Sequence, residues 1–260
     1  MDKKIILEEM SWVEVRDAIQ SGRDSVIICA GVVEQHGPQL PLNTDTVLGQ
    51  YGCIKIAEQM QNMLVGPPLN FGVTWNLRDF PGTVHLRDET MIQLLIDYID
   101  SLIRAGFKNI IFLCQHGSNV PALQAVIYRY NLEKKARVMM IQPWGYVPEG
   151  IGPLFNRQVG FHANETETSM MLHVAPELVQ MDKAEGVVEI PDAPSIRDQS
   201  YRFLVQVYSP RAEPGRGGAW LITKTGAFGT PSKATREFGE KLVEGYIKNI
   251  VKDLRVILSD

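Results

Sequence analysis

The feature that most constrains the fold of this chain is an alternation of continuously apolar segments with amphipathic ones. The apolar segments are short, rich in β-branched residues and bounded by turn formers, and they span residues 25–33, 108–114 and 137–142. Such segments are typical of strands covered on both faces. Helical spacing of apolar residues marks 46–62, 88–105, 119–132 and 234–257, with Asp88 as an expected N-cap. This order predicts the α/β class, with a mostly parallel sheet and helices on both sides.

Length and composition favour one domain over residues 1–260. The chain has 260 residues, 45% of them hydrophobic, and a domain of this size hides roughly 70–75% of its unfolded surface. The formal net charge is −4, with acidic and basic residues interspersed, so we expect no nucleic-acid partner. The longest apolar run is about eight residues, far below the roughly 18 of a membrane span, so we expect no membrane partner either.

The cysteines indicate a reducing compartment. Their number is odd, they form no CxxC pair, and they lie inside apolar segments as Cys29, Cys53 and Cys114. This pattern is typical of small core residues in a reducing environment. We therefore expect a soluble, unexported protein of the cytoplasm.

Polar clusters follow two of the expected strands, and a third cluster precedes a helical stretch. The first holds Glu34, His36 and Asp45, the second runs from Gln115 and His116 to Ser118 and Asn119, and the third holds His162, Glu165 and Glu167. In parallel sheets, ligands bind beyond the carboxyl ends of the strands, where such loops converge. The clusters are therefore expected to meet at one end of the molecule.

Carboxylate and imidazole groups together suit zinc, manganese or iron. In an extended segment, Glu34 and His36 would point the same way, and the two oxygens of Asp45 could bridge two ions. Ions roughly 3.5–4 Å apart generate a hydroxide and polarise a carbonyl group, as amide hydrolysis requires.

Each cluster also has an ordinary structural interpretation. Glu34 and His36 could be a pair of loop residues, and His116 could be a hydrogen-bonded structural histidine. His162 and Glu167 could be exposed residues at a helix start, where carboxylates suit the macrodipole. His85 and His173 fit only a structural interpretation.

Residues 187–218 break the alternation. This stretch contains several prolines and a GRGG run, and long irregular segments in compact domains are usually functional or mobile. The glycine run favours a flexible turn over an anion site, since no helical pattern follows it directly.

Five motifs, in order along nearly the whole chain, resemble those of the creatininase family. They are EQHGPQLPLNTD, FPGTVHL, CQHGSN, HANETETSMML and GTPSKATREFGEK. The resemblance implies a three-layer α/β/α hydrolase fold and a homo-oligomer, with a hexamer favoured. It also implies divalent metal ions, expected as two per subunit (Zn, Mn or Fe).

Position by position, the resemblance makes Glu34, His36, Asp45 and His116 metal ligands, with Asp45 bridging, and makes His162 the proton shuttle. In creatinine hydrolysis a glutamate two places after the histidine that matches His116 completes the second metal site, but this chain has Ser118 there. Glu167 is our candidate replacement, as ligand and catalytic group.

The expected substrate is a small molecule, and other departures from the family argue against creatinine. Gln158, Val159 and Phe161 stand where the creatinine enzymes carry tryptophan, aspartate and glutamate. Trp144 matches an aromatic position of their pocket wall. Further expected substrate contacts are Trp75, Asn76, Arg78 and Ser118. Gln115 and Asn119 are expected to orient neighbouring groups or to hydrogen-bond the substrate.

These observations predict hydrolysis of a small polar amide, cyclic or formylated, by a metal-bound hydroxide. Three alternatives stay open at this point. One is opening of an oxidised inositol ring at a C–C bond, and another is peptide trimming in cofactor biosynthesis. The third is a binding or regulatory protein that has lost its second metal, a reading motivated by Ser118.

Overall fold

The computed structural model describes residues 4–75, 77–133, 135–146, 148, 151, 162–185, 225–227 and 229–259. The stretch 187–218 lies outside the described residues, so the structure does not test a role for it. Asn76, Gln158, Val159 and Phe161 also lie outside them. No helix within the described ranges combines the length and apolarity that a bilayer crossing requires.

A parallel sheet forms the centre of the molecule. Its strands are β1 (Ser25–Ala30), β2 (Met63–Val65), β3 (Asn109–Cys114) and β4 (Arg137–Ile141), in the spatial order β2-β1-β3-β4. Every pairing is parallel. All six residues of β1 are buried, as expected for a strand covered on both faces.

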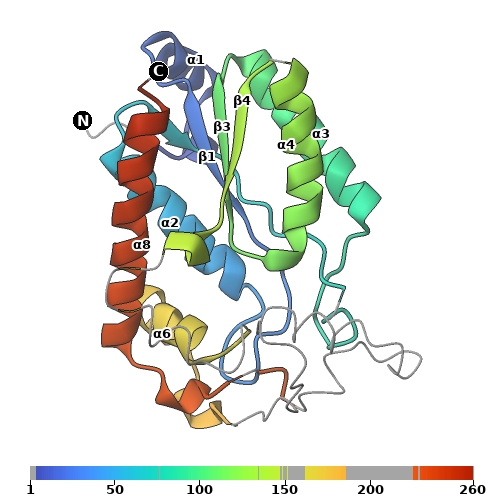
Figure 1. The fold of residues 1–260 in the computed structure, drawn as a ribbon, viewed down its shortest axis with the longest axis vertical. Helices are drawn as coiled ribbons and strands as arrows, with labels where there is room; N and C mark the ends of the chain where they lie inside the picture. Colours follow the sequence, from blue (N-terminus) through green and yellow to red (C-terminus); the bar gives the residue numbers. More distant parts are fainter. Residues whose placement is uncertain are drawn as a thin grey trace, which may run out of the picture.

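Helices cover the two faces of this sheet, so the fold is a three-layer α/β/α sandwich (Figure 1). The helices are α1 (Trp12–Gln20), α2 (Thr44–Gln59), α3 (Asp88–Ala105), α4 (Val120–Glu133), α6 (Glu165–Val174) and α8 (Arg236–Ile257). Val26 and Ile28 of β1 pack with α3 and α4, whereas Ile27 and Cys29 pack with α2 and α8. The predicted fold class is thereby confirmed.

Local details differ from the sequence-based expectations. Strand β1 ends at Ala30 rather than at residue 33, because the chain beyond it leaves the ladder; Gly31 donates to the carbonyl of Leu69 instead. Asp88 is the first residue of α3 and not its cap, which is Arg87; the Asp88 carboxylate accepts from the Trp75 indole. Strand β2 was not expected, since three residues are too few to show a pattern.

The cysteines and the two outlying histidines lie where the sequence placed them. Cys29, Cys53 and Cys114 are free and buried. His85 accepts a hydrogen bond from the backbone N–H of Thr74, and His173 lies 3.7 Å from Glu244.

The contact between α6 and α8 depends on Gly239. A Cβ atom built there would lie 1.8 Å from the Ser169 carbonyl oxygen, which is backbone and cannot give way easily. Alanine is ordinarily about 1 kcal/mol better than glycine inside a helix. We expect overpacking to outweigh that gain, so that Gly239→Ala lowers the free energy of unfolding by roughly 1–3 kcal/mol.

Denaturant unfolding followed by circular dichroism measures this effect. Gly145→Ala is the control, since among the described residues no heavy atom beyond its chain neighbours lies within 4 Å of a Cβ built at Gly145. Equal stability of the Gly239 variant and the wild type would show that overpacking costs no more than the gain in helix propensity, against this prediction.

Candidate metal centre

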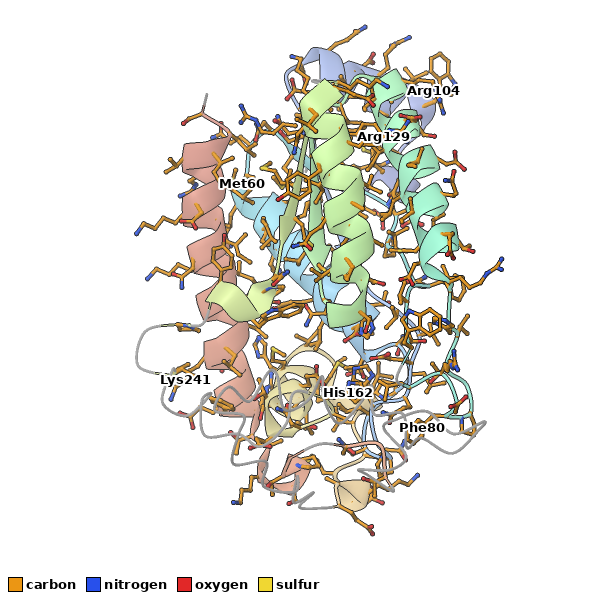
Figure 2. All side chains as sticks on the ribbon, turned by 45° about the vertical axis from the view of Figure 1, so that its right-hand side comes forward. Met60, Phe80, Arg104, Arg129, His162 and Lys241 are labelled. Atoms are coloured by element: carbon orange, nitrogen blue, oxygen red, sulfur yellow. The ribbon has the colours of Figure 1, made fainter. Side chains whose placement is uncertain are left out.

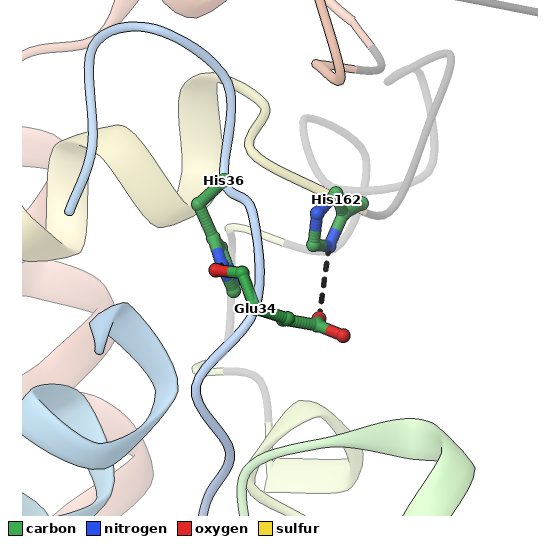
Figure 3. A group of neighbouring side chains, drawn as sticks. All are labelled: Glu34, His36 and His162. Carbon is green, nitrogen blue, oxygen red and sulfur yellow. Dashed lines mark hydrogen bonds and ion pairs between the residues drawn. The ribbon is translucent and has the colours of Figure 1, made fainter. Parts of the chain in front are cut away.

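Side chains from four parts of the chain meet beyond the carboxyl ends of β1 and β3. We call this group the carboxylate–histidine cluster; it consists of Glu34, His36, Asp45, His116, His162 and Glu167. His162 lies at the same end of the molecule as Phe80 and at the opposite end from Arg104 (Figure 2). Figure 3 shows Glu34, His36 and His162 facing one another, with His162 Nδ1 3.6 Å from Glu34 Oε1.

Strand register brings the first two parts together. Ala30 and Cys114 pair at the last rung of the β1–β3 ladder, and Gln115 N then donates to the Ala30 carbonyl. The chain therefore leaves the sheet at the same level on both strands. His116 and Glu34 lie just beyond this level, with His116 Nδ1 3.2 Å from Glu34 Oε1.

The loop between Glu34 and α2 returns Asp45 to the cluster. Glu34 N donates to the Leu42 carbonyl, which closes the loop, and Gly37 takes a left-handed φ of 70° that favours glycine. Asp45 then lies in the first turn of α2, where a carboxylate also suits the helix macrodipole. The loop conformation thus determines the position of the third side chain.

Helix α6 supplies the last part through its N-terminus. Asn164 is the N-cap, and its side-chain oxygen accepts from the backbone N–H groups of Thr166 and Glu167. The carboxylate of Glu167 turns back to accept from Ala163 N. Ala163 has a φ of 50°, unusual for a residue with a side chain, and Gln39 Nε2 donates to its carbonyl. These contacts hold Glu167 within 3.9 Å of His36 Nε2.

Asp45 lies between two groups of potential ligands. Its Oδ1 is 3.2 Å from His36 Nε2, and its Oδ2 is 3.2 Å from His116 Nδ1. Glu34, Asp45 and His116 could hold one ion, and His36, Asp45 and Glu167 could hold a second. Glu34, His36 and His162 form a third possible group.

Each histidine of the cluster directs one ring nitrogen at a backbone carbonyl and the other inward. His36 Nδ1 lies 3.1 Å from the Glu34 carbonyl oxygen, and His116 Nε2 lies 2.9 Å from that of Val73. His162 Nε2 lies 2.7 Å from the Gln35 carbonyl oxygen. In a neutral ring of His36 or His116 the single N–H would donate to its carbonyl partner, so the inward nitrogen keeps its lone pair. This arrangement is typical of metal-ligating histidines. At His162 the Gln35 side-chain Nε2 also lies 3.0 Å from ring Nε2.

The inward atoms fit a divalent cation. Within the described residues, both carboxylate oxygens of Glu34, Oδ2 of Asp45 and Nε2 of His36 are buried without a hydrogen-bond partner. These three residues are at most 2% exposed. Burying carboxylates is costly unless positive charge lies beside them, and a cation between these atoms would supply that charge. The donor set of oxygens and imidazole nitrogens suits zinc, manganese or iron.

The electrostatics of the cluster without an ion support this fit. Burial opposes protonation of His36, but the charges of Asp45, Glu167 and Glu34 outweigh it and raise its pKa to about 10. Burial, together with the charges of Asp45 and Glu34, raises the pKa of Glu167 to about 7. Burial and the charge of His36 lower the pKa of His162. The raised pKa values of His36 and Glu167 mean that the cluster binds protons when no metal ion is present, and a cation would take their place.

Other predicted site residues lie around or away from the cluster. Gln115 is buried with Oε1 unpartnered within the described part of the chain, and Ser118 is half-buried. Trp144 is 40% exposed on the short helix Pro143–Tyr146. The Trp75 ring lies against His85 and under the Arg78 guanidinium. Among the described residues, no hydrogen bond or ion pair joins these three side chains directly to the cluster.

Two glutamines of the opening motif have supporting contacts that sequence reasoning missed. The Gln35 side chain accepts from Gly37 N and donates to the Gly226 carbonyl, and Gln39 donates to the Ala163 carbonyl and to Thr168 Oγ1. The sequence offered one signal for these contacts: both glutamines lie among the ligand-type residues Glu34, His36 and Asp45. Glu165 accepts from Thr230 N and belongs to none of the possible ligand groups.

Fold and cluster together define a three-layer α/β protein with a buried carboxylate–histidine centre suited to divalent cations. Residues 8–254 match the family model described as creatininase, creatinine amidohydrolase. The chain therefore belongs to the creatininase family, and the resemblance seen in its motifs is confirmed.

Relatives within the family differ in activity. The mycofactocin precursor peptide peptidase of Mycolicibacterium smegmatis is 29% identical, over 84% of this chain and 78% of that protein. The creatinine amidohydrolase of Pseudomonas putida is 27% identical, over 98% of each. A solved structure named "Creatininase Mn" superposes with a TM-score of 0.78 at 23% identity, covering 97% of this chain and 98% of that one.

Proposed function

We propose that this protein is a metal-dependent hydrolase that cleaves the C–N bond of a small polar amide. The observation that carries the proposal is the convergence of unpartnered, buried oxygen and nitrogen atoms from Glu34, His36 and Asp45. Glu34 and His116 would hold one ion, His36 and Glu167 a second, and Asp45 both. The manganese in the name of the related structure and the amidohydrolase name of the Pseudomonas putida relative support this proposal.

Two such ions would supply a Lewis acid for the carbonyl group and lower the pKa of water. The protein's own residues would orient the reaction. Gln35 fixes the His162 ring through its carbonyl, so that Nδ1 faces the cluster beside Glu34. From there the Nδ1 lone pair of His162 would take up the proton that the attacking water releases and pass it to the departing nitrogen. The burial of the cluster would exclude bulk water and strengthen each of these interactions.

A peptide substrate is the second candidate, because the Mycolicibacterium smegmatis relative is named as a peptidase. The two candidates share the bond type and differ in the size of the substrate. A screen that includes formamides, lactams, hydantoins, an inosose-type ketone and short peptides, with products identified by mass, would decide between them. It would also test the ring-opening alternative.

Elemental analysis of the purified protein accompanies the screen. Two equivalents of a divalent metal, together with amide hydrolysis that Glu34→Ala abolishes, are the expected result. One ion or none, with no hydrolysis of any compound in the screen, would favour the binding or regulatory alternative. The predicted hexamer and cytoplasmic location stay predictions; light scattering coupled to size exclusion measures the former.

Zinc binding to the metal-free protein at pH 7 is expected to release protons. The raised pKa of His36, about 10, means that its ring is protonated at pH 7 when no ion is bound, and zinc requires the neutral ring. Titration with zinc in weak buffer, followed with a pH electrode, measures the release. His173→Gln is the control and should release as much acid as the wild type. Zinc binding without proton release would contradict the proposed role of His36.

A further inference from the structure

The Val73 carbonyl oxygen sets the orientation of His116. His116 Nε2 lies 2.9 Å from this oxygen, and Nδ1 lies 3.2 Å from both Glu34 Oε1 and Asp45 Oδ2. Because the neutral ring has one proton, donation to Val73 keeps the lone pair on Nδ1. If the Val73 carbonyl were displaced, the His116 proton would no longer be held on Nε2, and Nδ1 could lose the lone pair that faces the cluster.

Side chains, rather than a strand ladder, hold the backbone around Val73. Gly72 forms an isolated bridge with His85, and Leu86 N donates to the Gly72 carbonyl. Val73 N donates to Asn119 Oδ1 at 3.0 Å, and Thr74 N donates to His85 Nδ1 at 3.0 Å. The peptide group between Val73 and Thr74 thus joins two histidines, with its C=O bonded to His116 and its N–H to His85.

Asn119 binds this segment from the same turn that carries His116. Its backbone N–H donates to the His116 carbonyl, and its side-chain Nδ2 donates to the Gly31 carbonyl at the end of β1. The side chain is fully buried, and a Cβ atom built at Gly72 would lie 2.3 Å from Asn119 Oδ1. Glycine at position 72 therefore permits the approach, and the amide of Asn119 is committed to backbone groups.

His85 is suited to act as an acceptor. Burial and the charge of Arg78 lower its pKa, so the ring stays neutral with a lone pair on Nδ1. The Trp75 ring packs against it with a centroid distance of 4.5 Å and limits its rotation.

We propose that Asn119 and His85 are positioning residues for His116, because they hold the Val73 carbonyl that fixes the His116 ring. This proposal rests on the proposed metal-dependent function. It gives Asn119 the orienting role, one of the two roles that the sequence left open for this residue. It also makes His85 a support of His116, through the peptide group between Val73 and Thr74.

Asn119→Ala tests the proposal through zinc affinity, measured on the full-length protein by competition with a chromophoric chelator. Loss of a group that hydrogen-bonds a metal ligand typically weakens metal binding by roughly 10–100-fold. Because Asn119 acts through Val73, we expect a loss near the lower end of that range. Asn131→Ala is a matched control, because the Asn131 side chain pairs with the N–H and C=O of Val138 in the same way, far along α4 from His116. Its zinc affinity should equal that of the wild type. A folded Asn119 variant with wild-type zinc affinity would overturn the proposal.

A second pair of variants decides the matter if Asn119→Ala does not fold. His85→Phe keeps a ring against Trp75 but has no acceptor, whereas His85→Asn keeps an acceptor atom close to the place of Nδ1. Zinc affinity should fall in the former and recover in the latter. Equal affinities in both would contradict the proposal.

Ring ¹⁵N chemical shifts of the metal-free protein report the tautomer of His116, so they test the positioning role independently of metal binding. In the wild type at high pH, the His116 proton should reside on Nε2, and His85→Phe should shift it partly to Nδ1. A wild type that binds no zinc would refute the metal function, while these shifts would still decide the positioning role. An unchanged tautomer in His85→Phe would refute that role alone.

Discussion

Asp45→Asn is expected to abolish hydrolysis and to lower zinc affinity by more than the roughly 10–100-fold that loss of an outer partner causes. Asp45 is the residue shared by both proposed metal positions, since its two oxygens face His36 and His116 separately. Asparagine has nearly the same shape but offers one neutral oxygen and an N–H₂ group that repels a cation. One substitution should therefore affect both positions together.

Metal content per chain and zinc competition measure this prediction. Asp97→Asn, on the exposed face of α3, removes the same charge away from the cluster and should leave both quantities unchanged. Circular dichroism establishes that the Asp45 variant is folded. Full metal content with undiminished hydrolysis would exclude Asp45 as a bridging ligand.

His162→Gln is expected to lower kcat by a factor of about 10²–10⁴, the usual contribution of a positioned acid or base, while metal content stays at the wild-type level. The loss should depend on the substrate. An amide whose departing nitrogen is a strong base needs the proton that His162 would deliver, whereas an activated anilide departs with less assistance. The anilide should therefore lose much less rate than the alkyl amide.

His173→Gln is the control for this experiment, since His173 contacts Glu244 and Tyr51 rather than the cluster. An equal loss for both kinds of substrate would contradict proton delivery by His162. Loss of metal would instead make His162 a ligand, as its group with Glu34 and His36 allows.

The sheet and the meeting of the polar clusters could be predicted because both follow from patterns that are local in sequence. β1 and β3 are continuous apolar segments, and parallel strands bring the residues after them to one edge. Glu34 and His116 therefore needed no long-range information to be paired. β2 was missed because three residues carry no period.

The supporting contacts could not be predicted, because they join single polar side chains to backbone groups far along the chain. Asn119 reaches Gly31, and Gln39 reaches Ala163, at separations of 88 and 124 residues. Such a contact imposes no periodicity on either segment. For the same reason the sequence leaves open whether Asn119 orients neighbouring groups or contacts the substrate, because it shows the residue type and not its partners.

The parallel register of β1 and β3 has a consequence for how this protein can change. Both strands release the chain at the Ala30–Cys114 rung, so the spacing between Glu34 and His116 is counted in whole residues along each strand. A single-residue insertion within either strand would rotate its downstream side chains to the opposite layer and carry the ligands out of reach. We therefore expect lengthening to be tolerated in surface loops, while the two central strands must keep their lengths if the proposed metal centre is to form.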